Sequence, residues 1–169
     1  MILLTMGTYP LPFDRMVEAV DLLCKDGLIE DEIFAQIGYT KYIPRYMKYE
    51  KLLEKERFDS ILSESSALIG HAGMGTITLA LEYGKPLLVM PRLKKYGEHV
   101  NDHQLGTAVK FEELGCILVA YEEKDLPEKI NALKTFVPTP RENQPDRVAK
   151  RIQDFLTVID KGLKKNEKR

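Results

Sequence analysis

The sequence predicts an α/β fold, in which one parallel sheet carries helices on both faces. Short apolar runs alternate with segments whose apolar residues recur at helical spacing. Near the middle, residues 65–91 read SSALIGHAGMGTITLALEYGKPLLVMP. This stretch is an apolar run, a glycine loop, a helical segment ended by Gly84 and a second apolar run. A strand, helix and strand in this order form a βαβ unit, whose strands run parallel.

The expected strands are short apolar runs, most of them bounded by glycine, proline or charged residues. They are predicted at Ile2–Met6, Glu32–Ile37, Tyr46–Leu53, Ala67–Ile69, Leu87–Met90 and Cys116–Ala120. The fourth and fifth are the two strands of the βαβ unit. Tyr46–Leu53 has the most polar character of the six. Four tyrosines at and before it, at positions 39, 42, 46 and 49, indicate a core edge or a partner surface rather than a platform for bases.

The expected helices have apolar residues three or four positions apart. They are predicted at Phe13–Cys24, Glu54–Ser63, Thr76–Tyr83, Asp102–Leu114 and Leu126–Leu133. A late helix, Pro145–Leu163, begins at a proline and has one apolar face, so it folds back on the sheet or docks on a partner. A basic tail, 164–169, follows it. We expect the whole chain, 1–169, to form one domain.

Composition excludes several classes of protein. The 169 residues are 44% hydrophobic and 30% charged, which is typical of a globular domain, and the net charge of −1 argues against a general nucleic-acid binder. Two cysteines in apolar settings, Cys24 and Cys116, indicate buried thiols rather than a disulfide framework or a metal site. No apolar run is long enough to span a membrane, and a strand from residue 2 leaves no room for a signal peptide. The cytoplasm is the expected compartment.

The glycine loop has a chemical use. Gly70, Gly73 and Gly75 lie between a strand and a helix start. Free N–H groups and the helix dipole favour an anion there, and glycines let it approach, so phosphate or diphosphate is the expected ligand. The alternative is a tight left-handed turn that binds nothing. Gly7 and Thr8, after the first strand, border the same crevice or form a plain turn.

A basic loop, 92–101, follows the strand Leu87–Met90. Its cations, Arg92, Lys94 and Lys95, contact phosphate or are simply solvated. A dinucleotide fingerprint fits this region poorly, because Thr78 stands where its third glycine belongs and Glu98, the nearest acidic residue, lies in a loop rather than at a strand end. The glycine loop is also central rather than in the first βα unit. We therefore discount NAD.

A combined motif points to one family. It consists of His71-Ala72-Gly73-x-Gly75-Thr76, then Glu82, Gly84-Lys85-Pro86 and Asn101-Asp102-His103-Gln104. It resembles the C-terminal, donor-binding domain of family 28 glycosyltransferases, over Thr5 to about Phe111. The stand-alone subunits of the family are most similar. They are the eukaryotic subunit that adds the second N-acetylglucosamine to dolichol-diphosphate GlcNAc, and bacterial exopolysaccharide or capsule subunits of two-chain enzymes. The resemblance implies a Rossmann-like sheet of the GT-B C-terminal-domain type.

The resemblance also implies roles for single residues. Those expected to hold the diphosphate of a UDP-sugar are Gly7, Thr8, Gly73, Gly75 and Thr76. His71 is the expected catalytic residue, as a donor to the phosphates, or else a structural histidine. Glu82 is expected to accept hydrogen bonds from ribose hydroxyls.

The residues expected at the donor sugar are Asn101, His103 and Gln104, and Asn101 or Asp102 is also a candidate helix cap. Met74 and the loop 92–94 are where the choice of sugar is expected to be made. No metal or other cofactor is required. For a general base, His99 and His103 are candidates without a placed partner.

A complete enzyme of this family has two domains, and this chain has room for one. The resemblance therefore implies a hexosyltransferase subunit that transfers sugar from a UDP-sugar to a polyprenyl- or dolichyl-diphosphate-linked saccharide, in exopolysaccharide or glycolipid biosynthesis. A membrane-anchored, acceptor-binding subunit would hold it at the cytoplasmic membrane face, with Pro145–Leu163 as the contact. The basic tail would meet an anionic membrane surface or be a soluble end. Alone, the chain can also self-associate. The alternatives are a non-catalytic nucleotide-sugar-binding or regulatory subunit and a dinucleotide-binding enzyme.

Overall fold

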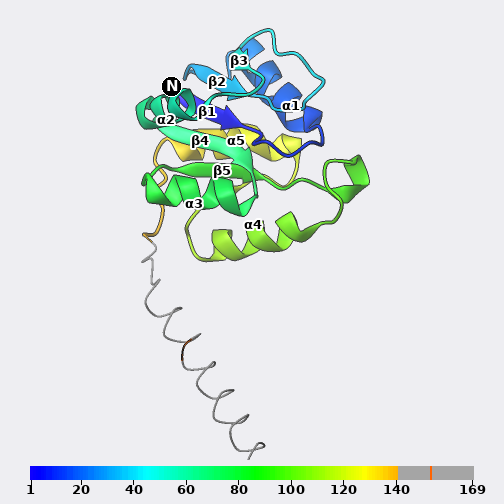
Figure 1. The fold of residues 1–169 in the computed structure, drawn as a ribbon. Coiled ribbons are helices and arrows are strands. Elements are labelled where there is room, and N and C mark those ends of the chain that lie inside the picture. The colour runs from blue at the N-terminus through cyan, green and yellow to red at the C-terminus, as the bar shows by residue number, and fades with distance from the viewer. Residues whose placement is uncertain (141–152, 154–169) are drawn as a thin grey trace, which may run out of the picture.

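The protein is built on one six-stranded parallel sheet (Figure 1). The computed structural model describes residues 1–140 and Gln153. The strands are β1 (Ile2–Thr5), β2 (Ile33–Gln36), β3 (Lys48–Glu50), β4 (Ala67–His71), β5 (Leu87–Met90) and β6 (Leu118–Val119). Their order across the sheet is β3-β2-β1-β4-β5-β6, and every pairing is parallel. The predicted late helix and basic tail fall outside the described residues except for Gln153.

Helices form most of the connections between these strands, although β2 and β3 are joined without one, and the predicted α/β class is confirmed. They are α1 (Asp14–Lys25), α2 (Lys55–Glu64), α3 (Met74–Glu82), α4 (His103–Glu113) and α5 (Leu126–Leu133), with single 3₁₀ turns at Lys94–Tyr96 and Glu123–Asp125. Each predicted helix of this region lies within two residues of an observed one. None of the helices within the described residues is long and apolar enough to cross a membrane.

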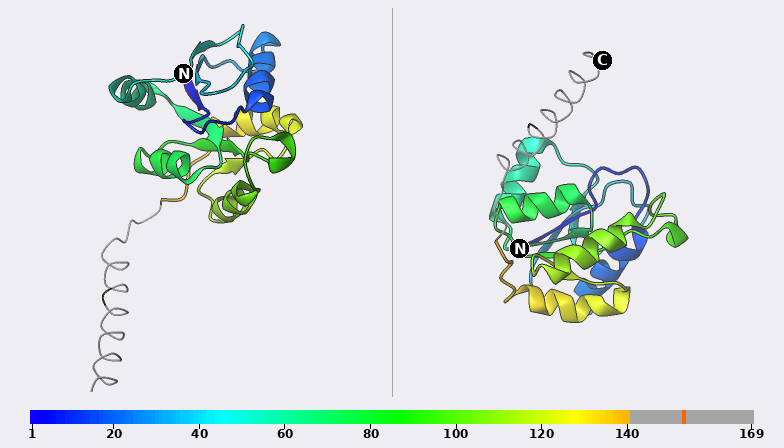
Figure 2. Two further views of the ribbon diagram at one scale, coloured as in Figure 1. Left: turned by 45° about the vertical axis from the view of Figure 1, so that its right-hand side comes forward. Right: turned by 90° about the horizontal axis from the view of Figure 1, so that it is seen from below.

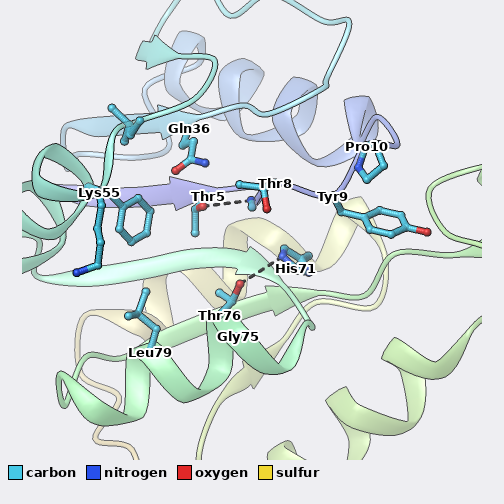
Figure 3. A pocket seen from close by; sticks show the side chains of 13 residues that line it. Thr5, Thr8, Tyr9, Pro10, Gln36, Lys55, His71, Gly75, Thr76 and Leu79 are labelled. Atoms are coloured by element: carbon cyan, nitrogen blue, oxygen red, sulfur yellow. Dashed lines mark hydrogen bonds between the residues drawn. The ribbon is translucent and has the colours of Figure 1, made fainter.

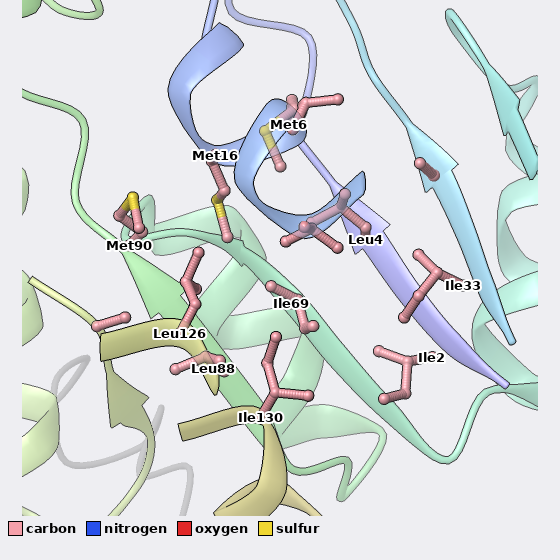
Figure 4. Close-up of a cluster of buried hydrophobic side chains, with 14 of the residues drawn as sticks. Ile2, Leu4, Met6, Met16, Ile33, Ile69, Leu88, Met90, Leu126 and Ile130 are labelled. Carbon is pink, nitrogen blue, oxygen red and sulfur yellow. The ribbon is translucent and has the colours of Figure 1, made fainter. Parts of the chain in front are cut away.

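The sheet separates two apolar cores. Successive side chains of a strand point to opposite faces, so Ile2 and Leu4 of β1 enter one core while Leu3 enters the other. The first core lies under α1 and α5, and Figure 4 shows part of it. The second lies under α2, α3 and α4. The left view of Figure 2 shows α1 (blue) and α5 (yellow) apart from α2 and α3 (cyan to green). Helices on both faces are thus confirmed.

Strands β3 and β6 are much shorter than the sequence predicts, whereas β1 and β2 differ from their predicted ranges only at end residues. β3 covers only Lys48–Glu50 of the expected Tyr46–Leu53, because the N–H of Tyr46 donates to the buried carboxylate of Asp21 (2.8 Å) instead of to the sheet. β6 covers only Leu118–Val119 of the expected Cys116–Ala120, since the N–H of Cys116 bonds to the end of α4, at the carbonyl of Phe111 (3.0 Å). At the N-terminal end of each strand, another acceptor thus takes a backbone donor that the sheet would otherwise use.

Strand β1 marks the point where the strand order reverses. In register, Leu4 of β1 faces Ala35 of β2 on one side and Ile69 of β4 on the other. The connections that leave β1 and β4 therefore diverge, and they open a crevice at the carboxyl ends of these two strands. Open α/β sheets bind their ligands at such a switch point. The fold thus predicts where a site should be.

Candidate functional site

A pocket of about 620 Å³ opens at this switch point (Figure 3). It is lined by Thr5, Gly7, Thr8, Tyr9, Pro10, Gln36, Leu53, Lys55, Phe58, His71, Gly75, Thr76 and Leu79. These residues come from the ends of β1, β2 and β4 and from α2 and α3. The volume is in the range of pockets that enclose a small molecule. Gly7, Thr8, His71, Gly75 and Thr76, all named from the sequence, meet in this pocket.

The start of α3 forms one wall of the pocket. The helix begins at Met74, two residues earlier than predicted, after Gly73 in an extended conformation (φ −83°, ψ 141°). The first intrahelical bond runs from the N–H of Ile77 to the carbonyl of Gly73 (3.1 Å). The N–H groups of the three residues before Ile77 therefore precede the helical ladder, as at any helix N-terminus. None of Gly70, Gly73 and Gly75 has a positive φ, so the left-handed turn is excluded.

The glycines have two different uses. A Cβ atom on Gly73 would overlap the imidazole of His71, and one on Gly7 would lie 2.9 Å from its Nε2. These two glycines make room for a side chain. A Cβ on Gly75 would meet nothing within 4 Å, although this residue lines the pocket. Gly75 is therefore the position at which the backbone is open to a ligand.

His71 stands at the end of β4 between Thr76 and α4. Its Nε2 lies 3.3 Å from Oγ1 of Thr76, and its Nδ1 lies 3.3 Å from Nε2 of Gln104. Burial, with a smaller contribution from the nearby Arg92 cation, lowers the pKa of His71 to about 4. The imidazole is therefore neutral at physiological pH.

Gln104 and Arg92 lie next to this histidine inside the protein. Gln104 is 3% exposed, and its Oε1 accepts the backbone N–H of Arg92 (3.2 Å). The prediction that Arg92 is solvated or meets phosphate is wrong, because its side chain is 1% exposed. The guanidinium donates to the carbonyls of Met6 (3.0 Å) and Leu11 (2.9 Å), and burial lowers its pKa to about 10. Lys94 and Lys95 are exposed, as predicted for solvated lysines.

Glu98 is also buried, with 3% of its surface exposed. Its carboxylate accepts two hydrogen bonds from Arg15 (2.8 and 3.0 Å) and one from the N–H of Leu93 (2.9 Å). This residue is the nearest acidic candidate for the ribose contact of a dinucleotide site. Its carboxylate oxygens already accept hydrogen bonds from Arg15 and Leu93. Glu98 is therefore a poor partner for a ribose, which agrees with our decision to discount NAD.

The remaining predicted sugar contacts lie beside the pocket lining. The ring of His99 stacks on Tyr9 (centroids 4.6 Å apart) and meets His103 edge-on (4.5 Å), so all three histidines of the sequence gather at this edge of the sheet. Oδ1 of Asn101 accepts the N–H of His103 (3.2 Å), while the Asp102 carboxylate accepts the N–H of Lys94. Asp102 is the N-cap residue of α4 but makes no side-chain capping bond, while Asn101, one residue earlier, accepts the N–H of the first helical residue. Asn101 and His103 are exposed.

Glu82 is exposed at the last residue of α3 and is not part of the pocket lining. It follows Leu79, which lines the pocket, by three residues and Gly75 by seven, so the three share one face of the helix. The distance from Gly75 to Glu82 along the axis is about 10 Å. Glu82 therefore lies beyond the outer end of the pocket, in line with the helix start.

Sequence reasoning did not assign the other pocket-lining residues to the site, namely Thr5, Tyr9, Pro10, Gln36, Leu53, Lys55, Phe58 and Leu79. Gln36 is 4% exposed, and its Oε1 is buried without a hydrogen-bond partner among the described residues. An unpaired buried polar atom is destabilising and is uncommon in native proteins. The signal that could have found it is its position at the end of β2, since the carboxyl ends of neighbouring parallel strands meet at one edge of the sheet.

Comparison with known proteins identifies the family. Residues 1–159 match the model of the glycosyltransferase family 28 C-terminal domain. The chain belongs to this family. The resemblance stated from the motif is thereby confirmed, and the chain is a glycosyltransferase-family domain with a GT-B, Rossmann-like fold.

The share of each relative that this family 28 domain matches varies widely. A UDP-N-acetylglucosamine–N-acetylmuramyl-(pentapeptide) pyrophosphoryl-undecaprenol N-acetylglucosamine transferase of Aquifex aeolicus (strain VF5) is 37% identical over an alignment of 101 residues, and the match covers 53% of the chain and 28% of that protein. The chain thus spans little more than a quarter of this curated relative. The solution structure of ALG13 matches with a TM-score of 0.57 at 20% identity, over 86% of the chain and 91% of ALG13. The crystal structure of MurG from Acinetobacter baumannii matches with 0.51 at 24%, over 79% and 40%.

Proposed function

We propose that this chain is the donor-binding, catalytic subunit of a two-component glycosyltransferase. It transfers a hexose from a UDP-sugar to a saccharide linked to a polyprenyl or dolichyl diphosphate, in polysaccharide or glycolipid biosynthesis. The observation that carries the proposal is the pocket at the switch point, where Gly75 is open, the α3 start offers free N–H groups, and His71 and Thr76 are adjacent. Family membership supports the reaction class.

The pocket suits a diphosphate because it includes the start of α3 and a lysine. The N–H groups at the α3 start and the Lys55 ammonium at the mouth offset the negative charge that grows on departing UDP. Glu82, beyond the outer end of the pocket, is in line to accept ribose hydroxyls. Asn101 and His103 lie on the other side of His71, where the donor sugar would extend.

The proposal includes a partner chain. The acceptor-binding half would come from a second, membrane-anchored protein, and the region 145–163, outside the described residues, remains our proposed contact. Without that protein, the same surface can pair two copies of the chain.

A specific observation favours the non-catalytic alternative. No aspartate or glutamate is among the pocket-lining residues of the described part of the chain, so a carboxylate base is not in place. His71 is neutral, but its ring nitrogens already contact Thr76 and Gln104. In our proposal, the partner supplies the base. In the alternative, the chain only binds or senses a nucleotide sugar.

Ligand-induced thermal stabilisation tests donor binding, because a ligand that binds only the folded state raises the melting temperature. We expect UDP and a subset of UDP-sugars to raise the Tm of the isolated chain, and NAD to leave it unchanged. Stabilisation by NAD alone would refute the proposal. A Gly75→Ala variant, folded but insensitive to UDP, would assign the effect to this pocket.

Transfer activity separates the enzyme from the passive binder. The chain is co-expressed with its membrane partner, and transfer of radiolabelled sugar from the UDP-sugars that stabilise it to a polyprenyl-diphosphate saccharide is measured. We expect activity with both chains and none with either alone. Glu82→Ala should raise the KM for the donor, with Glu64→Ala, at the exposed end of α2, as the matched control. Binding without transfer in the presence of the partner would favour the regulatory alternative.

A further inference from the structure

We infer that Gln104 is a positioning residue that holds His71 in a single tautomer, with its Nε2–H directed at the pocket. Four groups form a directional chain of hydrogen bonds, from the backbone of Arg92 through Gln104 and His71 to Thr76. This role differs from the sugar contact that the family resemblance implies for Gln104. The function of the relay rests on the proposed binding of a diphosphate, but its geometry does not.

The backbone N–H of Arg92 fixes the direction of this chain of hydrogen bonds. A backbone N–H can only donate, so the side-chain atom of Gln104 that lies 3.2 Å from it must be the carbonyl oxygen. The amide nitrogen then faces the other way, toward His71. The usual ambiguity between the oxygen and the nitrogen of a glutamine is thereby removed. Because Gln104 is 3% exposed, water offers little competition for either contact.

The amide nitrogen in turn fixes the tautomer of His71. An amide NH₂ has only hydrogens to offer, so Nδ1 of His71, 3.3 Å away, must accept. A neutral imidazole with an unprotonated Nδ1 has its hydrogen on Nε2. The charged or titratable groups that face the ring are Arg92 and His99, and neither provides an anion that would stabilise a second proton.

The last hydrogen bond of the chain joins two residues that line the pocket. Nε2 of His71 lies 3.3 Å from Oγ1 of Thr76, and both residues line the pocket. When His71 donates to this oxygen, the hydroxyl hydrogen of Thr76 is free to point at a ligand. The pocket therefore receives donors from this side, as an anionic phosphate requires. In this tautomer Nε2 cannot accept a proton, so His71 acts as a hydrogen-bond donor and not as a general base.

The first test is the tautomer itself, which can be read without any ligand. Two-bond ¹⁵N–¹H NMR spectra distinguish a protonated from an unprotonated ring nitrogen, and a His71→Gln variant assigns the His71 signals. In the unaltered chain at pH 7, we expect an unprotonated Nδ1 and a protonated Nε2. The opposite tautomer, or a mixture of the two, overturns the inference.

Two near-isosteric variants test the role of Gln104. Gln104→Glu replaces the donor by an acceptor, so Nδ1 should become protonated. Gln104→Met removes the donor, so the two tautomers should mix and UDP affinity should fall about tenfold, as for the loss of one charge-assisted hydrogen bond. Asn101→Ala, which removes a contact of His103 only, should leave the His71 signals unchanged. Unaltered His71 spectra in both Gln104 variants would refute the positioning role.

The two readouts separate this inference from the proposed function. If the predicted tautomer is present but UDP does not bind, the relay stands and the donor-binding proposal fails. If UDP binds and the Gln104→Met protein binds it as tightly as the unaltered chain does, donor binding stands and the relay has no part in it.

Discussion

A Cβ atom on Gly73 would lie 2.7 Å from Nδ1 of His71, closer than Cβ atoms approach other atoms in real proteins. A Cβ on Gly7 would lie 2.9 Å from Nε2 of the same ring. The imidazole is therefore held between two bare backbone positions, one after β1 and one before α3. The two glycines nearest His71 are therefore needed to make room for the histidine ring.

Gly73→Ala should consequently damage the site through His71. The added methyl group must displace the ring, and such overpacking typically lowers the free energy of unfolding by about 1–3 kcal/mol. We expect a loss of this size in urea denaturation, together with changed His71 NMR signals. Unchanged His71 signals in a stably folded Gly73→Ala protein would contradict the proposed clash.

Gly75→Ala should have the opposite effect on stability. Gly75 is the second residue of α3 and has open space at its Cβ, so alanine should raise the free energy of unfolding by about 0.5–1 kcal/mol. The methyl group would nevertheless project into the pocket and weaken UDP binding, measured by calorimetry. Gly106→Ala in α4, also with open space, is the matched control. It should raise stability without affecting UDP, and equal UDP affinity in all three proteins would show that Gly75 is not at the ligand.

His71 should make stability depend on pH. Its pKa in the folded protein is about 4, below the ordinary value of 6.5, so between these values the unfolded chain binds more protons. Stability should therefore rise with pH from about 4 to about 6.5 and lose this contribution as pH falls. His71→Gln should flatten the curve of unfolding free energy in that window. A His71→Gln curve parallel to that of the unaltered chain would show that the histidine is not buried in its neutral form.

The guanidinium of Arg15 forms a largely buried ion pair with the carboxylate of Glu98. The two side chains are about 10% and 5% exposed, and Glu98→Ala would leave the guanidinium without its buried anion. We expect a loss of about 3–5 kcal/mol in unfolding free energy. The double variant Arg15→Met/Glu98→Met should recover part of it, because the unpaired Arg15 guanidinium is removed, although the buried Arg92 cation still loses its nearby anion. A double variant no more stable than Glu98→Ala would argue that packing, not charge, dominates.

We expect the native Gln36 side chain to lower the free energy of unfolding while it strengthens binding of the UDP-sugar. Its Oε1 is buried without a partner among the described residues, so Gln36→Met should leave stability unchanged or raise it by about 1 kcal/mol. Because Gln36 lines the pocket, the same change should lower affinity for UDP-sugars. Titration of both proteins with the donor identified by thermal shift checks this. A less stable Gln36→Met protein with normal affinity would indicate a purely structural glutamine.

The fold was predictable because its signals are local and repeated. Apolar runs, helical spacing and glycine punctuation each specify one element, and the βαβ unit specifies parallel pairing. The sequence also placed His71, Gly75 and Thr76 together, since they lie on one short stretch at a helix start. The errors in β3 and β6 arose where a buried carboxylate or a helix end takes a backbone donor that a strand would otherwise use.

Other features could not be read from the chain, because they depend on distant contacts. Arg92 lies in a basic stretch that looks solvated, yet the carbonyls of Met6 and Leu11, more than eighty residues away, bury it. Gln36 is unremarkable in sequence and lines the pocket only because β2 lies beside β1. Gln104 was assigned by resemblance to a sugar, whereas both ends of its amide are occupied by Arg92 and His71.

The position of β1 between β2 and β4 has a consequence for folding kinetics. Both partners of this strand lie far along the chain, at Ile33–Gln36 and Ala67–His71, so the centre of the sheet closes only after long loops have formed. Proteins dominated by such distant pairings cross their folding barrier slowly. We therefore expect this domain to refold more slowly than most domains of its size. Until β4, which contains Leu68, pairs with it, the apolar segment Ile2–Thr5 remains exposed and prone to aggregation.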